Sequence, residues 1–340
     1  MASIIVPVFN AAPFLDDLCQ SIQAQSYTNF EALFWDDGSS DSSLSVLQKY
    51  SADSRFKIMS WKENRGVSAA TTALLRAMKG EYWCHPGADD VLEPGFLEKR
   101  LEVTRRIPDA VIIHGPGWNI DERGDSLTAT DFPGLMPEVL EGRSAMEIML
   151  EHNIINTPSV LVNAAVTREI LDRFAGGWRY AQDWFLWILH LATGRPLVWH
   201  AERLHKYRIH AQSLTMRPTV AATRLLELRL VPLCALGAAQ DISPVARECW
   251  TRWRSSLYAL WLRRAFKLYR MGQLEPAWVD AGARAFYGRD DKSWAIHVEC
   301  VRHALNIIKT TVREGRAKRT IDFEVAGLAQ VGHPLFHRSK

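Results

Sequence analysis

The stretch that decides the fold is Ser-Ile-Ile-Val-Pro-Val-Phe-Asn (Ser3–Asn10), and a second apolar run ending in Trp-Asp-Asp-Gly-Ser-Ser-Asp (Trp35–Asp41) has the same pattern. Each run stops abruptly at turn-forming residues, so each predicts a buried strand followed by a loop. Because small-molecule sites of open parallel sheets form at the carboxyl ends of the strands, we expect the two loops to lie side by side in such a site. The loops carry aspartate carboxylates and no glycine-rich sequence of the kind that binds phosphate. This combination indicates a site for a ribose, a base and a metal.

Strand and helix patterns alternate along the first half of the chain. This alternation predicts an α/β fold with a mostly parallel sheet that is flanked by helices on both faces. Strands are expected at Ser3–Val8, Glu31–Trp35, Phe56–Trp61, Tyr82–His85 and Ala110–His114. Helices are expected at Pro13–Gln25, after Asp41 or Ser42, at Val67–Met78 and at Glu93–Ile107.

The alternation ends near Arg143. Helical patterns follow at Arg143–Glu151, Thr167–Phe174 and Ala181–Leu191, and Leu197–His210 is predicted to be extended. After Thr215 strand patterns largely vanish, and helices are expected at Val245–Arg270, Pro276–Phe286 and Asp291–Glu314. We therefore predict an α/β domain over 1–215 and a smaller all-α domain over 216–340.

Composition narrows the class of protein. With 47% hydrophobic and 23% charged residues, the 340-residue chain is globular. Its five cysteines are scattered and show no CxxC spacing, which argues against a disulfide framework or a zinc site and favours a reducing compartment. The N-terminus has no signal-peptide pattern, and the longest apolar run, Trp184–Ala192, is too short to cross a bilayer. We expect a cytoplasmic protein that is soluble or at most peripheral on the inner face of the membrane.

Charge is distributed unevenly. Residues 1–215 carry 20 Lys and Arg against 27 Asp and Glu, a net charge of −7, whereas residues 216–340 carry 21 against 11, a net charge of +10. Arginine and tryptophan mix through Arg247–Arg270 at helical spacing, which is typical of a packed stripe. The alternative is a surface for the acceptor or for an anionic membrane. No motif that reads nucleic acid accompanies the charge, so we expect no nucleic-acid partner.

An acidic pair follows the fourth predicted strand, in His-Pro-Gly-Ala-Asp-Asp-Val-Leu (His85–Leu92). Gly87 permits a tight turn, after which both carboxylates leave the strand end. Oxygen ligands of this kind suit Mg²⁺ or Mn²⁺. The alternative is an Asp-rich turn that caps the following helix.

Six segments resemble, in order and spacing, the family 2 glycosyltransferases. They are Val6–Asn10, Asp36–Asp41, Glu63–Ala70, Gly87–Asp90, Tyr180–Trp187 and Tyr207–Thr215. The resemblance covers about residues 2–215 and implies the GT-A fold, a nucleotide-binding α/β domain that usually holds a divalent metal through an acidic pair.

The resemblance also implies roles for single residues. Pro7, Phe9 and Asn10 would line the nucleotide, Asp37 would bind its base, and Asn64, Arg65 and Gly66 would border it. Asp89 would reach the ribose or the metal, Asp90 the metal, and His210 the metal or the diphosphate. Which of Asp89 and Asp90 is the main ligand stays open. Two departures from the family are Thr71-Thr72, where Arg-Asn is frequent, and Gly87, where an acidic residue is frequent.

Asp183, in Tyr180–Trp187, is the candidate general base that takes the proton of the acceptor hydroxyl. The alternative is a helix-capping aspartate in a first turn. His210 could equally be a hydrogen-bonded surface histidine, and Arg208 and Ser213 could donate to phosphate oxygens or be structural.

The function that the resemblance implies is an inverting, metal-dependent glycosyltransferase of the hexosyltransferase type, with Mn²⁺ or Mg²⁺ as cofactor. Its donor would be a nucleotide-sugar, expected to be a UDP-sugar. Its acceptor would be a hydroxyl of a saccharide or glycoconjugate, as in surface polysaccharide or lipid-linked oligosaccharide synthesis. The alternative is a non-catalytic or weakly active nucleotide-sugar-binding protein of the same fold.

Overall fold

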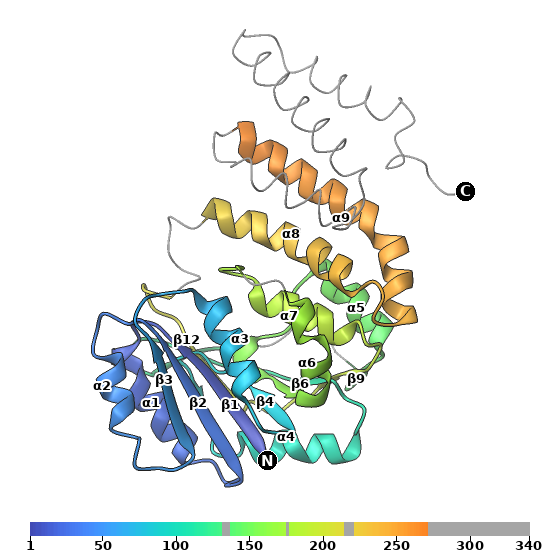
Figure 1. Cartoon of the computed structure of the whole chain (residues 1–340). Coiled ribbons are helices and arrows are strands. Elements are labelled where there is room, and N and C mark those ends of the chain that lie inside the picture. Colours follow the sequence, from blue (N-terminus) through green and yellow to red (C-terminus); the bar gives the residue numbers. More distant parts are fainter. Residues whose placement is uncertain (131–136, 175–176, 214–220, 271–340) are drawn as a thin grey trace, which may run out of the picture. The chain divides into compact units, whose positions relative to one another are not determined.

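The computed structural model describes residues 1–130, 137–174, 177–213 and 221–270 (Figure 1). Contacts divide the chain into two compact units, Met1–Trp250 and Thr251–Lys340. The helices predicted at Pro276–Phe286 and Asp291–Glu314 lie outside the described residues.

An eight-stranded sheet forms the centre of the first unit, in the order β3-β2-β1-β4-β10-β6-β11-β9. Strand β1 is parallel to β2 and β4, β2 to β3, and β6 to β11, whereas β10 and β9 are antiparallel to their neighbours. The predicted mostly parallel α/β sheet is thus confirmed. The strands are β1 (Ala2–Val8), β2 (Phe30–Asp37), β3 (Phe56–Trp61), β4 (Tyr82–Cys84), β6 (Ile112–His114), β9 (Val139–Leu140), β10 (Leu161–Asn163) and β11 (Leu197–Trp199).

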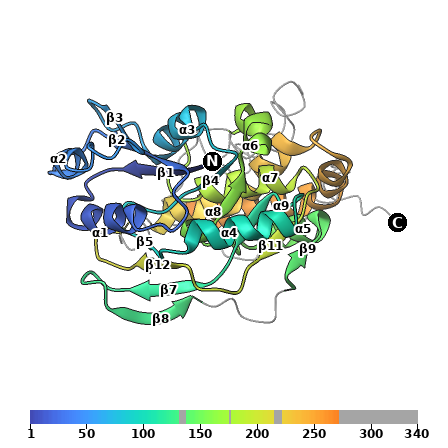
Figure 2. The same cartoon turned by 90° about the horizontal axis from the view of Figure 1, so that it is seen from below.

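Helices cover both faces of this sheet. Helices α3 (Val67–Ala77) and α6 (Ala164–Ile170) lie on one side of β1 and β4, and α1 (Ala12–Gln23) and α4 (Phe96–Arg106) lie on the other (Figure 2). The apolar stripe of α1 is fully buried, as its helical spacing predicts. The short helix α2 (Ser43–Gln48) packs beside α1.

A second sheet of four short strands has the order β5-β12-β7-β8. Its strands are β5 (Val91–Leu92), β12 (His205–Arg208), β7 (Gly117–Ile120) and β8 (Ser126–Thr130). The segment Leu197–His210, predicted as extended, therefore supplies β11 to one sheet and β12 to the other. Because β5 follows the acidic pair directly and pairs with β12, this sheet joins Asp90 to the segment that ends in His210.

Three further helices complete the described part of the first unit. Helix α7 (Gln182–Leu191) is buried on nearly all sides because α5 (Gly142–Glu151) and α8 (Ala221–Ala239) both pack against it. Its apolar run is therefore a core helix. Single-turn helices η1 (Thr157–Ser159) and η2 (Leu171–Arg173) follow α5 and α6. Within the described ranges, no helix has both the length and the apolar character needed to cross a membrane.

Helix α9 (Pro244–Arg270) begins in the first unit and continues in the second. Trp250, Leu257 and Trp261 are buried along it, which agrees with a packed stripe. The predicted boundary after Thr215 falls inside the first unit. The all-α domain over 216–340 stays a prediction.

Candidate functional site

The loops that follow β1 and β2 are joined by hydrogen bonds, as their sequences predict. The Asn10 N–H donates to Ser39 Oγ (2.9 Å), and the Ser40 N–H donates to Asn10 Oδ1 (2.8 Å). Asn10 has a φ of 50°, a left-handed conformation that asparagine tolerates better than most residues. Phe9 is 45% exposed next to this turn, and Pro7 pairs with Trp35 across the two strands.

Asp37 holds the loop between β3 and α3. It is buried, and its two oxygens accept the backbone N–H groups of Arg65 (2.7 Å) and Gly66 (2.8 Å). Gly66 has a φ of 92°, which favours glycine. Asn64, Arg65 and Gly66 therefore lie beside the end of β2, and the Arg65 guanidinium stacks 4.8 Å from the Trp61 ring.

The two carboxylates of the acidic pair have different environments. Asp90 is buried, and its oxygens accept the N–H groups of Gly87 (2.7 Å) and Arg208 (3.1 Å). Burial, and next the neighbouring charge of Asp89, raise the pKa of Asp90. Asp89 is the more open of the two, with 28% of its side chain exposed.

His210 lies directly against the open carboxylate. Its Nε2 is 2.8 Å from Asp89 Oδ2, and its ring packs 4.4 Å from that of Phe14. A Cβ atom on Gly87 would stand 2.6 Å from Asp89 Oδ1 and 2.8 Å from Asp90 Oδ2. In this turn a side chain in place of Gly87 would displace both carboxylates. This is a physical reason why the chain has glycine where an acidic residue is frequent in the family.

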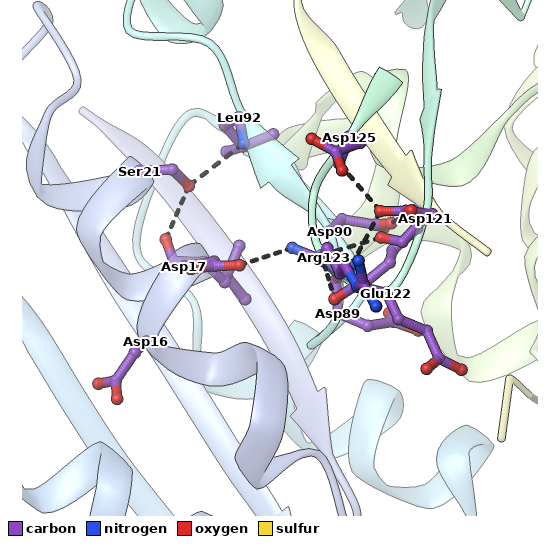
Figure 3. A network of polar contacts seen from close by, with 12 residues as sticks. Asp16, Asp17, Ser21, Asp89, Asp90, Leu92, Asp121, Glu122, Arg123 and Asp125 are labelled. Carbon is purple, nitrogen blue, oxygen red and sulfur yellow. Dashed lines mark hydrogen bonds and ion pairs between the residues drawn. The ribbon is translucent and has the colours of Figure 1, made fainter. Parts of the chain in front are cut away.

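Arg208 ties this loop to α1 and to the turn between β7 and β8 through hydrogen bonds to Asp17, Asp89, Asp121 and Glu122, all four of which are labelled in Figure 3. Its buried guanidinium donates to the carbonyl oxygens of Asp89 (2.8 Å), Asp121 (3.1 Å) and Glu122 (3.2 Å), and to Oδ2 of Asp17 (2.7 Å). These contacts favour the structural alternative for Arg208, because its donors are directed to the protein itself.

Asp183 occupies the first turn of α7 and is partly buried. Thr157 Oγ1 (2.8 Å) and Asn153 Nδ2 (3.3 Å) both donate to its Oδ2. Burial raises the pKa of Asp183 more than these hydrogen bonds lower it. Neither side-chain donor uses Oδ1.

A polar chain leads from the start of α7 to the loop of the acidic pair. Gln182 Nε2 donates to Thr71 Oγ1 (3.2 Å), which lies 3.4 Å from His85 Nε2. All three side chains are buried. A second connection starts at Asn156, the residue before Thr157. The Nδ2 atom of Asn156 lies 3.1 Å from Nε2 of His205 on β12. Thr71, a departure from the family at sequence level, is thus part of the link between the two regions.

Asp89 and His210 are the side chains whose chemistry fits a divalent cation. A carboxylate and an imidazole in contact are both cation ligands; Asp89 is partly exposed, and His210 is buried behind it with its Nε2 on the Asp89 carboxylate. Asp90 fits less well because its side chain is buried, whereas 28% of the Asp89 side chain is exposed. Across the described ranges, no group of three or more His, Cys, Asp and Glu side chains is arranged to hold a metal.

Comparison with known proteins identifies the family. A profile of glycosyl transferase family 2 matches residues 3–174, which is just over half of the chain. The chain belongs to glycosyl transferase family 2.

Curated relatives are distant. An uncharacterized glycosyltransferase of Haemophilus influenzae is 29% identical over 213 residues, which cover 62% of this chain and 66% of the relative, so the chain spans just under two thirds of its length. The putative teichuronic acid biosynthesis glycosyltransferase TuaG of Bacillus subtilis is 27% identical over 230 residues, 66% of this chain and 85% of TuaG.

Solved structures support the fold. The S. aureus TarS 1–349 structure in complex with UDP-GlcNAc aligns with a TM-score of 0.63 over 93% of both chains, at 16% sequence identity. At this identity the likeness concerns the fold, and it confirms the expected GT-A architecture.

Sequence reasoning missed several residues around Asp183. Thr157 and Asn153 are common polar residues without a distinctive pattern. Glu227 on α8 accepts three backbone N–H groups just before α7, and α8 itself was not predicted. The sequence did offer one signal for Glu227, a single carboxylate among leucines in Leu225-Leu226-Glu227-Leu228. A charged group buried among apolar residues needs a hydrogen-bonding partner.

Proposed function

We propose that this protein is an inverting, metal-dependent glycosyltransferase that moves a sugar from a UDP-sugar to a hydroxyl of a saccharide or glycoconjugate. The observation that carries the proposal is Asp183, partly buried at the start of α7, with a raised pKa and with both side-chain donors on Oδ2. A raised pKa makes this carboxylate a stronger base than an ordinary aspartate, as general base catalysis requires.

The donor site is proposed along the carboxyl ends of β1, β2 and β4. The exposed Phe9 ring and the Asn10 turn would line the nucleotide, and Asn64, Arg65 and Gly66 would border it. Asp37 would face the base through lone pairs that remain beside its two backbone hydrogen bonds, since a carboxylate offers about four acceptor positions.

Asp89 and His210 are the proposed ligands of Mn²⁺ or Mg²⁺, and Asp90 supports the turn from within. When bound, the cation would neutralise charge on the diphosphate leaving group.

The proposed reaction is a single displacement. The acceptor hydroxyl oxygen bonds to the anomeric carbon, its proton passes to Asp183 Oδ1, and the bond from the anomeric carbon to the diphosphate oxygen breaks. Attack from the face opposite the diphosphate inverts the configuration. Proton transfer of this kind contributes roughly 10²–10⁴ in rate, and alignment and charge neutralisation contribute the rest.

The deciding experiment measures binding and turnover separately. The full chain is titrated with UDP in the presence of Mn²⁺, and then assayed for hydrolysis of UDP-glucose, UDP-galactose and UDP-N-acetylglucosamine without acceptor. Binding with hydrolysis of at least one donor supports the enzyme. Binding without turnover, with or without saccharide acceptors, supports the non-catalytic alternative, and absence of binding contradicts both.

The cellular setting is proposed on sequence grounds alone. We propose a cytoplasmic protein of surface polysaccharide or lipid-linked oligosaccharide synthesis whose basic C-terminal region contacts an anionic membrane or the acceptor. Flotation of the full chain with vesicles of anionic or neutral phospholipid tests the membrane part, since electrostatic binding requires the anionic lipid and is lost at high salt.

A further inference from the structure

The geometry points to Glu227 as a positioning residue that holds the start of α7, and with it Asp183, in place for catalysis. This inference rests on the proposed function of Asp183. It assigns a role in the reaction to α8, a helix that supplies none of the residues predicted for the site.

Glu227 makes an unusual set of contacts for a glutamate. It is only 2% exposed, and its carboxylate accepts the backbone N–H groups of Arg179 (3.0 Å to Oε1), Tyr180 (2.7 Å to Oε2) and Ala181 (3.2 Å to Oε2). Ala181 is the N-cap residue of α7 and makes no side-chain cap hydrogen bond. A glutamate from a different helix therefore supplies the acceptor for the three successive N–H groups that lead into α7.

Both sides of this contact, the backbone N–H groups and the carboxylate, need a hydrogen-bonding partner when they are buried. The three N–H groups belong to a segment outside helices and strands, so they have no partner in a regular backbone ladder, and a buried carboxylate is costly unless it is hydrogen-bonded. Hydrogen bonds to a charged acceptor are shorter and stronger than neutral ones. The three N–H groups and the carboxylate thus hold one another in a defined geometry.

A second hydrogen bond, from a side chain of α3, holds the same segment. Ser68 Oγ, on α3, donates to the Trp178 carbonyl oxygen (2.7 Å). Residues 178–181 lie outside helices and strands, so their path depends on these side chains. Asp183 comes two residues after the last N–H group held by Glu227, and a shift of this segment would move its carboxylate directly.

A role limited to overall stability is the competing explanation. It predicts that loss of Glu227 lowers the free energy of unfolding, while the folded molecules turn over normally. Positioning predicts instead that the folded molecules bind donor normally and turn it over slowly.

The test compares E227A and E227Q with the wild type and with E169Q, a matched charge removal at an exposed residue of α6. Hydrogen exchange over residues 178–184 is followed by mass spectrometry, UDP affinity is titrated with Mn²⁺, and kcat and KM are measured for the UDP-sugar that the wild type hydrolyses. Thermal denaturation gives the folded fraction.

For E227A we expect faster exchange over 178–184, a UDP affinity within about threefold of wild type, and a kcat roughly 10²-fold lower, the size of loss that a displacement of about 1 Å produces. E227Q keeps one carbonyl acceptor and should recover part of both kcat and protection. E169Q should match the wild type. If E227A does not fold, E227Q alone carries the test through its kcat and its exchange.

Two results would overturn the inference: unchanged exchange over 178–184, or a wild-type kcat in folded E227A and E227Q. If the wild type hydrolyses no UDP-sugar, the proposed function fails, and the exchange measurement still decides whether Glu227 holds this segment.

Discussion

Asp183 is the residue whose ionisation should set the pH range of the reaction. A general base acts in its ionised form, and burial raises the pKa of Asp183 above that of an ordinary aspartate, about 3.9. As the pH falls, Asp183 therefore becomes protonated earlier than an exposed aspartate would. We expect the acidic limb of kcat, in a pH profile of donor hydrolysis, to lie at a higher pH than the titration of an exposed aspartate. An acidic limb at an ordinary aspartate pKa would contradict this assignment.

Replacing Asp183 by asparagine separates catalysis from helix capping. We expect D183N to lose roughly 10²–10⁴ in kcat while it keeps UDP affinity. The amide oxygen can still accept from Thr157 and Asn153, and the neutral group avoids the cost of burying a charge. An acid whose folded pKa is raised lowers stability above that pKa, so D183N should be as stable as the wild type or more stable at pH 7.

Thermal denaturation at pH 7 checks the stability part of that prediction. A melting temperature several degrees below that of the wild type would favour the alternative in which Asp183 mainly caps α7.

Asp89 and Asp90 stand next to each other in sequence, yet they should respond differently to the same change. D89N and H210A each remove one of the two proposed ligands, and we expect each to weaken Mn²⁺ binding at least tenfold, measured by calorimetry or by the electron paramagnetic resonance of free Mn²⁺. D90N affects a buried carboxylate that accepts two backbone N–H groups, so its main effect should be on stability.

D125N is a suitable control for the metal variants, because Asp125 is an exposed aspartate in the neighbouring turn. Equal loss of Mn²⁺ affinity in D90N and D89N would contradict the distinction between the two carboxylates. Wild-type Mn²⁺ affinity in D89N would remove Asp89 from the proposed metal site.

At the scale of elements, β12 works as the connector of the site. Its last residue, Arg208, donates to four oxygens on the acidic-pair loop, on the β7–β8 turn and on α1. A lysine has one ammonium group and cannot reproduce the planar arrangement of these donors. We expect R208K to lower the free energy of unfolding by about 2–4 kcal/mol, because a buried network loses charge-assisted hydrogen bonds.

Urea denaturation of R208K against the wild type measures this loss. K206R is the matched control, since Lys206 lies on the same strand and its ion pair with Glu93 is only partly buried. An R208K change below about 0.5 kcal/mol, the range of ordinary surface substitutions, would contradict the connecting role.

Elements with long, regular patterns were predictable, whereas elements made by tertiary contacts were not. The apolar run of β1 and the amphipathic stripe of α1 are visible in the sequence and are confirmed. Strands β5 and β9 have two residues each, too few to show alternation. Helix α8 contains Pro232 and buries several faces, so it lacks the one-sided stripe by which helices are recognised.

The same distinction applies to the site. Asn10 and Asp89 follow strand ends, so chain order alone placed them at one edge of the sheet. The Asp89–His210 contact joins residues 121 apart in sequence, and the resemblance to the family, not their spacing, indicated that contact. Glu227 stands out in the sequence as a carboxylate in an apolar run, but its partners are backbone N–H groups, which no residue type marks, so the sequence did not indicate where it binds.

At the scale of the whole molecule, we expect the first compact unit to need α8 in order to fold. Leu230, Leu233 and Leu236 of α8 are completely buried, and α8 packs on α7 and α5. The burial of each leucine contributes about 1.5–3 kcal/mol, which a chain without α8 would lose together with the contacts of Glu227. This total is comparable to the whole stability of a typical domain, about 5–15 kcal/mol.

A chain that ends at Thr215 should therefore fail to fold, whereas a chain that ends at Trp250 should fold and bind UDP in the presence of Mn²⁺. The second chain retains all of α8 and the start of α9, and it matches the end of the first compact unit. Circular dichroism, thermal denaturation and UDP titration of the two truncated chains beside the full chain give the comparison. A folded, UDP-binding chain of residues 1–215 would restore the boundary predicted from sequence, and it would show that α8 is dispensable for the donor site.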